Sequence, residues 1–222
     1  MMAVIDTPAR FEAMRHAMVA SQLRTSAVDD PRVVDAMARV PREDFVPQEL
    51  RNLAYRDRPL PLGGGRAMNA PLTTGRLLTQ AAIGPRDTVL LIGSAGGYAA
   101  TVVAQLAAKV VAVEEDPVLR ATAVAAVAGN ARIVLVEGPL ANGAPDHAPY
   151  DVIVVDGAVE RLPEALLQQA RPGARIVTGL VDRGVTRLAS GERTEGGFGL
   201  FDFADMECVV LPGFEKPRGF RF

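Results

Sequence analysis

Short apolar runs alternate with helical stretches over the last two thirds of the chain. Residues 88–92, 109–113, 132–136, 150–155 and 175–178 are rich in Val, Ile and Leu and predict strands. Between and around them, the spacing of apolar positions predicts helices at residues 72–82, 99–108, 117–128 and 163–170. Buried strands that alternate with helices are typical of a parallel sheet with helices on both faces, so the pattern predicts an α/β fold.

The pattern of the first third predicts helices followed by an irregular segment. Phe11, Met14, Met18 and Val19 recur at helical spacing. A second helix is predicted from Asp30-Pro31, a side-chain cap followed by proline, and Pro41 ends it. Residues 45–71 show no period and are rich in Pro, Arg and Gly; long segments of this kind are usually functional or disordered.

The C-terminal part differs from the alternating pattern. Residues 185–211 predict an antiparallel hairpin about Gly196-Gly197. Residues 214–222 carry three phenylalanines, which predicts that the tail docks on its own domain or on a partner. We expect a single domain overall, with a helical extension and substrate loop (residues 1–71) packed on the main unit (residues 72–222).

Composition argues against several classes of protein. The 222 residues carry a net charge of −2 with acids and bases mixed, so no basic footprint for nucleic acid is expected. No apolar run reaches the roughly 18 residues of a membrane span, and the N-terminus lacks a signal-peptide pattern. Cys208 stands alone, so neither a disulfide framework nor a metal site is expected. These features predict a cytoplasmic protein; they leave its oligomeric state open.

Residues 89–98 are the most informative stretch for function. An apolar run ends in Gly93-Ser94-Ala95-Gly96-Gly97-Tyr98, and an Ala-rich helical stretch follows. A buried strand, a glycine turn and a helix N-terminus together form a nucleotide cradle. The next predicted strand ends beside Glu114, which is placed to accept hydrogen bonds from ribose hydroxyls. The alternative for the glycine turn is a tight strand-to-helix connection without a ligand. The alternative for Glu114 is a solvated acid at a strand end.

The chain resembles the protein-L-isoaspartate O-methyltransferases from about residue 14 to residue 213. The order and spacing of several short motifs carry the resemblance: Ser21-Gln22-Leu23-Arg24, Val40-Pro41-Arg42, Phe45-Val46-Pro47, Asp57-Arg58-Pro59-Leu60-Pro61, the glycine turn, His147-Ala148-Pro149-Tyr150-Asp151, Pro163-Glu164-Ala165-Leu166-Leu167 and Arg171-Pro172-Gly173. It implies a Rossmann-like class I methyltransferase sheet with an N-terminal helical extension and a C-terminal hairpin.

The resemblance also implies an activity, a cofactor and a site. S-adenosylmethionine (SAM) would lie over Gly93, Ser94, Ala95, Gly97 and Tyr98, with its ribose on Glu114 and with Gly138 nearby. The loop at residues 63–71 would present an isoaspartyl or other protein or peptide carboxylate for methylation, which starts protein repair. Within that loop, Asn69 would hold the carboxylate and Arg66 would assist electrostatically.

The departures from the family pattern fall at these positions. Leu91 stands where the family has an acid, two residues before the first glycine of the turn, and Ala95 replaces the middle glycine. Gly138-Pro139-Leu140 stands where the family has Gly-Asp-Gly. Asn69 stands for the active-site serine, and Asp156-Gly157-Ala158 stands for Thr-Ala-Ala. Loss of one charge-assisted hydrogen bond weakens binding about tenfold to a hundredfold. Asp156 is the candidate to replace the missing ammonium contact.

Two hypotheses remain. The first is methyl transfer from SAM to a protein or peptide carboxylate. The second is a family member that has lost the reaction and kept the fold as a binding or regulatory module.

Overall fold

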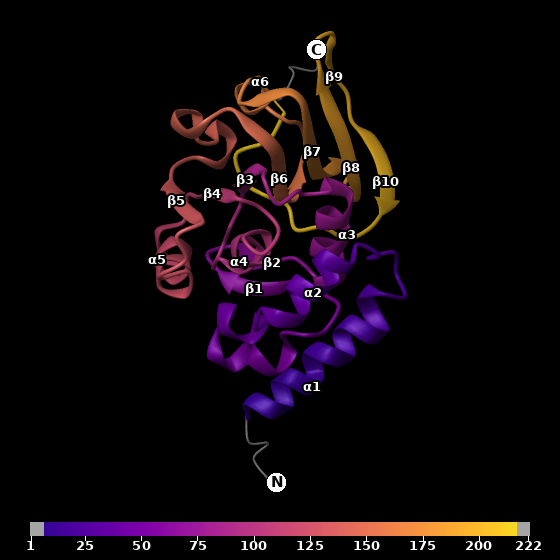
Figure 1. Ribbon diagram of the computed structural model, residues 1–222, viewed down its shortest axis with the longest axis vertical. Coiled ribbons are helices and arrows are strands. Elements are labelled where there is room, and N and C mark those ends of the chain that lie inside the picture. The colour runs from indigo at the N-terminus through magenta and orange to yellow at the C-terminus, as the bar shows by residue number, and fades with distance from the viewer. Residues whose placement is uncertain (1–6, 217–222) are drawn as a thin grey trace, which may run out of the picture.

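The computed structural model describes residues 7–216, and Figure 1 shows its N-terminal helices below a twisted sheet. The N-terminal part contains helices α1 (Pro8–Met18) and α2 (Pro31–Arg39), with a π-helical turn at Val19–Leu23 and 3-10 turns at Arg42–Phe45 and Gln48–Leu53. A small hairpin, β1 (Leu60–Gly63) and β2 (Arg66–Met68), follows, and α3 (Pro71–Ala81) leads into the sheet. The predicted cap of the second helix is confirmed, since the Asp30 side chain accepts from Arg32 N at 2.9 Å.

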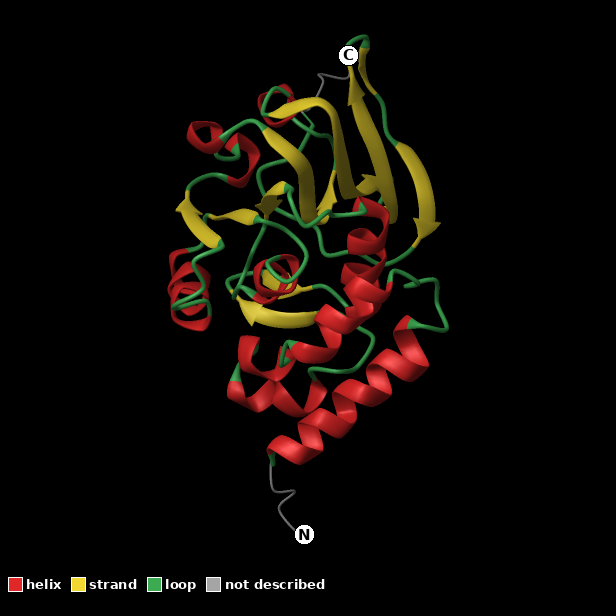
Figure 2. Cartoon of the chain, viewed as in Figure 1, coloured by secondary structure: helices red, strands yellow, loops and turns green. Residues whose placement is uncertain are grey.

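The main sheet has the strand order β10-β8-β7-β6-β3-β4-β5, and β9 pairs with β8. Its parallel part consists of β3 (Thr88–Ile92), β4 (Lys109–Glu114), β5 (Ile133–Glu137), β6 (Tyr150–Val159) and β7 (Ala170–Asp182). Antiparallel strands β8 (Val185–Thr194) and β10 (Phe201–Asp205) extend it, with the short β9 (Gly197–Phe198). The remaining α-helices of the described residues are α4 (Tyr98–Val103), α5 (Pro117–Ala126) and α6 (Glu164–Leu167), seen beside the strands in Figure 2. Two more 3-10 turns lie at Leu140–Asn142 and Pro145–His147.

Alternate side chains of the strands enter two different apolar cores. Val89 and Leu91 of β3 face a cluster that includes residues of α1, α2, α3 and α4. Leu90 and Ile92 face a second cluster that includes Leu166 of α6. Helices therefore cover both faces of a mostly parallel sheet, which confirms the predicted α/β fold and its C-terminal antiparallel strands.

Several local predictions need correction. Residues 45–71 contain the β1–β2 hairpin, whose loop residues Gly64 and Gly65 both have positive φ. Strand β7 begins at Ala170, so the expected turn at residues 171–173 is a bulge inside a strand. A further hairpin joins β7 to β8 through Arg183 and Gly184, both with positive φ, as a two-residue turn requires. The helices expected at residues 99–108 and 163–170 are shorter, Tyr98–Val103 and Glu164–Leu167.

The chain returns across the sheet after β10. Ala158 N donates to Val209 O at 2.7 Å, and Leu211 N donates to Ala158 O at 2.9 Å. This segment brings Leu211 and Phe214 into the second core, where they are 3% and 2% exposed. Docking on the protein's own domain is thus confirmed for Phe214, while residues 217–222 lie outside the described residues.

Gly157 allows the returning segment to pack closely. A Cβ at Gly157 would lie 2.9 Å from both Cδ atoms of Leu211 and closer still to its Cγ. We expect Gly157→Ala to lower the free energy of unfolding by about 1–3 kcal/mol, measured by urea denaturation. Gly199→Ala, where a Cβ would meet nothing within 4 Å, is the control. If the clash is the cause, Gly157→Ala costs less in a Leu211→Ala background; an equal cost in both backgrounds contradicts it.

Candidate active site

The predicted site residues gather where the order of the parallel strands reverses. Strands β3 and β6 are neighbours in the sheet. The connection after β3 leads to β4 on one side of this pair, and the connection after β6 leads to β7 on the other side. In open α/β sheets, ligands bind outside the carboxyl ends of the strands at this point. Gly93 follows β3, Glu114 ends β4, and Asp156 lies in β6.

The predicted glycine turn after β3 is present and contains three residues with left-handed φ. Gly93 and Gly97 have φ values of 79° and 99°, and Ala95 also adopts a left-handed φ of 47°. The turn directs several of its N–H groups onto β4: Gly93 N and Ser94 N donate to Val113 O, and Ala95 N donates to Glu114 at 2.7 Å. Ser94 is 2% exposed, and its hydroxyl is buried without a hydrogen-bond partner.

Glu114 is a buried carboxylate paired with Arg66. The two side chains are 1% and 6% exposed. Arg66 Nη1 lies 2.5 Å from Oε1, and Nη2 lies 3.1 Å from Oε2. Backbone N–H groups of Glu115 and Asp116 also donate to Oε1, each at 3.1 Å. The acid predicted to hold a ribose thus holds a guanidinium of the same chain.

The β1–β2 hairpin brings Arg66 to this position. Gly63 and Arg66 are register partners across its two-residue loop. At the tip, a Cβ on Gly64 would lie 2.9 Å from Asp116 Oδ2, so the hairpin packs against the N-terminal cap of α5. The sequence placed Arg66 beside a substrate carboxylate; the structure places it on the acid at the end of β4.

Asn69 and Asp156 form the second polar contact of the site. Asn69 Nδ2 donates to Asp156 Oδ1 at 2.9 Å and to Asp156 O at 3.1 Å. Asn69 Oδ1 accepts from Val209 N at 2.8 Å, and the Thr74 hydroxyl lies 3.4 Å from Asp156 Oδ1. Asn69, 1% exposed, therefore ties the loop before α3 to β6 and to the returning C-terminal segment.

Arg42 contacts the backbone of Asn69 and was not predicted as a site residue. It is fully buried and donates to Ala54 O at 2.7 Å and to Asn69 O. Its guanidinium lies 4.8 Å from the centre of the Tyr98 ring, and burial lowers its pKa. Tyr98 meets Phe45 edge to face, with ring centres 5.7 Å apart. The only signal for Arg42 in the sequence is a charged residue inside the family motif Val40-Pro41-Arg42.

The substituted positions supply fewer polar groups, as expected. Leu91 is fully buried in the first apolar core. Gly138 lies in the loop after β5, where a Cβ would meet nothing within 4 Å, and Pro139 follows it without an N–H. In the chain's own network, Asp156 faces Asn69 and Thr74.

The residues fit a nucleoside in their placement. The left-handed glycine turn, the buried acid at the end of β4 and the unpartnered Ser94 hydroxyl lie where a nucleoside is bound in this architecture. Glu114 and Asp156 are, however, already hydrogen-bonded within the chain. A nucleoside that used Glu114 would have to replace a contact that the protein makes with itself.

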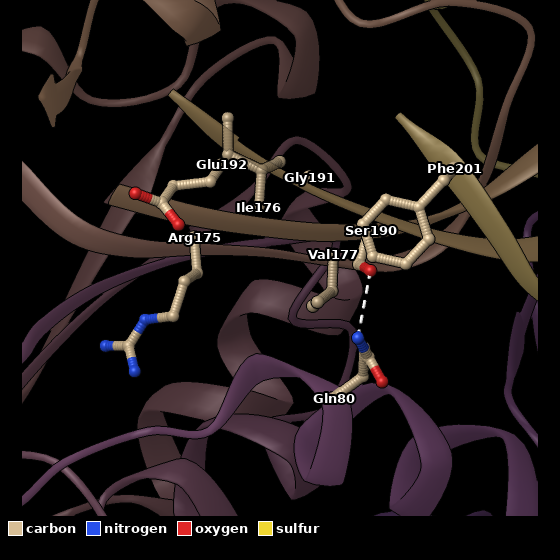
Figure 3. Close-up of a pocket in the computed structure, with 8 residues that line it drawn as sticks. All are labelled: Gln80, Arg175, Ile176, Val177, Ser190, Gly191, Glu192 and Phe201. Carbon is tan, nitrogen blue, oxygen red and sulfur yellow. Dashed lines mark hydrogen bonds between the residues drawn. The ribbon is translucent and has the colours of Figure 1, made fainter. Parts of the chain in front are cut away.

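A separate cavity lies between α3 and strands β7, β8 and β10. Figure 3 shows Gln80 and Ser190 hydrogen-bonded at 3.0 Å beneath Phe201 at its edge. None of the residues predicted for the site lines it. Among residues 7–216, no cluster of His, Cys, Asp and Glu could hold a metal ion, and no helix is long and apolar enough to cross a membrane.

The Asp156 carboxyl gives the site a pH-dependent contribution to stability. Burial raises its pKa above the ordinary 3.8, against the lowering effects of Asn69 and Arg42. A folded-state pKa raised in this way means that stability is greatest below the ordinary pKa and falls as pH rises toward the folded value. We expect wild type to lose stability relative to Asp156→Asn as pH rises above about 4, by up to about 1.4 kcal/mol per pH unit.

Urea denaturation of both proteins at a series of pH values measures this difference. Asp146→Asn, at an exposed position, is the control for removing a carboxylate. A difference between wild type and Asp156→Asn that stays constant with pH would contradict the prediction.

Comparisons with known proteins identify the family. The family model described as Protein-L-isoaspartate(D-aspartate) O-methyltransferase (PCMT) matches residues 13–200. A Protein-L-isoaspartate O-methyltransferase 1 from Rhodopseudomonas palustris (strain HaA2) is 38% identical over 216 residues, 96% of this chain and 88% of the relative. A Protein-L-isoaspartate O-methyltransferase from Methanoculleus marisnigri is 40% identical over 184 residues, 82% of this chain and 84% of that protein.

Solved structures agree on the fold. A protein-L-isoaspartate O-methyltransferase structure matches with a TM-score of 0.78 and 22% identity, covering 90% of this chain and 66% of that one. A Plasmodium falciparum beta-aspartate methyltransferase in complex with S-adenosyl-L-homocysteine matches with a TM-score of 0.74 and 17% identity, covering 89% and 97%. At these identities, the structures support the fold alone. The family model and the two relatives show that the chain belongs to the protein-L-isoaspartate O-methyltransferase family.

Proposed function

We propose that this protein is a SAM-dependent methyltransferase that acts on isoaspartyl or other protein or peptide carboxylates. The observation that carries the proposal is the buried Glu114 carboxylate beside a left-handed glycine turn, in a chain of this family. A carboxylate at this strand end is suited to accept both ribose hydroxyls of a nucleoside. Methylation of an isoaspartyl group would begin its repair.

The reaction requires no general base from the protein. A carboxylate acceptor has a pKa near 4, so it is ionised at neutral pH without a general base. When bound, SAM supplies a methyl group on a sulfonium, which is a ready leaving group. The work left to the protein is to hold the acceptor in line and exclude water. Loops held by hydrogen bonds around the carboxyl ends of β3, β4 and β6 suit this task.

The site residues divide into binding and positioning roles in this proposal. The turn at Gly93, Ser94, Ala95 and Gly97 and the start of α4 at Tyr98 would bound the nucleoside, with Glu114 on the ribose and Gly138 at the rim. Asn69, with both ends of its amide occupied, would position the loop at residues 63–71 (the acceptor loop) against Asp156. A lone buried thiol at Cys208 is typical of a reducing compartment, which supports the cytoplasm as the location.

A second candidate is a family member that binds without catalysing. The observation that favours it is internal pairing: Arg66 occupies Glu114, Asn69 occupies Asp156, and Leu91 offers no charge. Such a site is satisfied without a ligand. The two candidates differ in whether the protein binds SAM and S-adenosylhomocysteine (SAH).

Calorimetric titration with SAM and SAH tests the proposal. We expect saturable binding with a Kd below about 1 mM, and a Kd up to about tenfold higher in Glu114→Gln, because the charged acceptor for the ribose is removed. Glu137→Gln is the matched control, since Glu137 is the register partner of Glu114 on β5 and is 61% exposed.

Methylation of an isoaspartyl peptide, measured as methyl ester formed, is the second readout. Ester formation dependent on SAM would support the activity. The absence of heat at millimolar SAM and SAH, together with the absence of ester, would favour the binding module.

A further inference from the structure

The carboxylate placed to receive a ribose is held by an arginine on the acceptor loop. We propose that Arg66 competes with the ribose hydroxyls for Glu114, and so sets both the affinity for the cofactor and the contribution of its hydroxyls. This inference rests on the proposed function, because it concerns the nucleoside that the same site would bind.

Glu114 has no acceptor capacity to spare. Its two oxygens offer about four lone-pair positions. They receive five N–H donors: Nη1 and Nη2 of Arg66 and the backbone N–H groups of Ala95, Glu115 and Asp116. A ribose diol that donated two hydrogen bonds would therefore have to displace donors already in place.

Of these five donors, the two on Arg66 are the ones that can leave. The three backbone N–H groups belong to the glycine turn after β3 and to the chain between β4 and α5, whose positions are fixed by the sheet. Arg66 lies on a long side chain in a short hairpin. Gly63, Gly64 and Gly65 at its tip all have positive φ, in a conformation that glycine adopts without strain. Arg66 can therefore leave Glu114 by rotation of its own side chain, without breaking a backbone hydrogen bond of the sheet.

The displacement opposes binding. The Arg66–Glu114 pair is bidentate and almost fully buried, and hydrogen bonds between charged groups are stronger than neutral ones. Replacing them with bonds from neutral hydroxyls leaves a guanidinium that needs water or another anion. A ligand can also bind with Arg66 in place and leave its hydroxyls without Glu114. Both routes reduce what the hydroxyls contribute to affinity.

The test compares SAH with its 2′-deoxy analogue in wild type and Arg66→Gln by calorimetry. Glu114 keeps its three backbone N–H donors in Arg66→Gln, so the buried acid retains hydrogen-bond partners in the variant. Arg58→Gln, an exposed arginine just before the hairpin, is the matched control. Thermal unfolding without ligand checks that each variant is folded.

We expect Arg66→Gln to bind SAH about tenfold or more tightly than wild type, and to lose more affinity than wild type when the 2′-hydroxyl is removed. A merely structural role for Arg66 would not couple its substitution to a ligand hydroxyl. If Arg66→Gln does not fold, Arg66→Lys decides in its place. Lysine keeps the charge but cannot form the two parallel bonds, so a smaller gain in affinity is expected.

The outcomes separate this inference from the proposed function. Equal SAH affinity in wild type and the folded variant, or an equal effect of the 2′-hydroxyl in both, overturns the competition while leaving cofactor binding intact. Tighter binding in the variant with unchanged binding in Arg58→Gln supports it. Failure of both proteins to bind SAH at millimolar concentration overturns the inference and the proposed function together.

Discussion

The architecture of the site depends on satisfying a carboxylate buried at the end of β4. A charge removed from water is costly unless it is paired and hydrogen-bonded. Glu114 meets this requirement with donors from the glycine turn, from the start of the connection to α5 and from Arg66. One side chain thereby fixes the turn after β3 relative to β4 and draws the β1–β2 hairpin, which precedes it by almost fifty residues, onto the edge of the sheet.

A second contact fixes the other end of the same loop. Asn69 joins β6 through Asp156 and the returning C-terminal segment through Val209 N. Arg42, in the 3-10 turn at Arg42–Phe45, donates to the carbonyl of Asn69 and so connects that turn to the loop at residues 63–71. Residues 66 and 69 thus tie the acceptor loop to two parallel strands on either side of β3. The extension and the sheet share one apolar core as well as these polar contacts.

The sequence predicted the parallel strands and most helix positions, because buried strands and amphipathic helices leave periodic patterns in the sequence. It missed the β1–β2 and β7–β8 hairpins, whose signals were short turns such as Arg183-Gly184 inside segments without a clear period. The position of Glu114 at the end of β4 follows from the strand pattern and was predicted, and the site roles of Asn69 and Asp156 were implied by the family resemblance. Asp156 was expected after a strand at residues 150–155, whereas it lies within β6. The partners of these residues were not predictable, since a contact such as Arg66 with Glu114 joins residues 48 positions apart and depends on how a glycine hairpin folds back.

The pairing changes what attracts a cofactor to this site. The described residues bring two carboxylates, Glu114 and Asp156, together with two guanidiniums, Arg42 and Arg66. SAM carries a sulfonium, an ammonium and a carboxylate, so it is a net cation. A site with an acid at position 91 would draw that cation by its own charge, whereas Leu91 and two internally paired acids provide no such excess. Affinity here must come from shape, apolar contact and exchange of hydrogen bonds, which makes the strength of the internal contacts the determinant of whether a ligand binds.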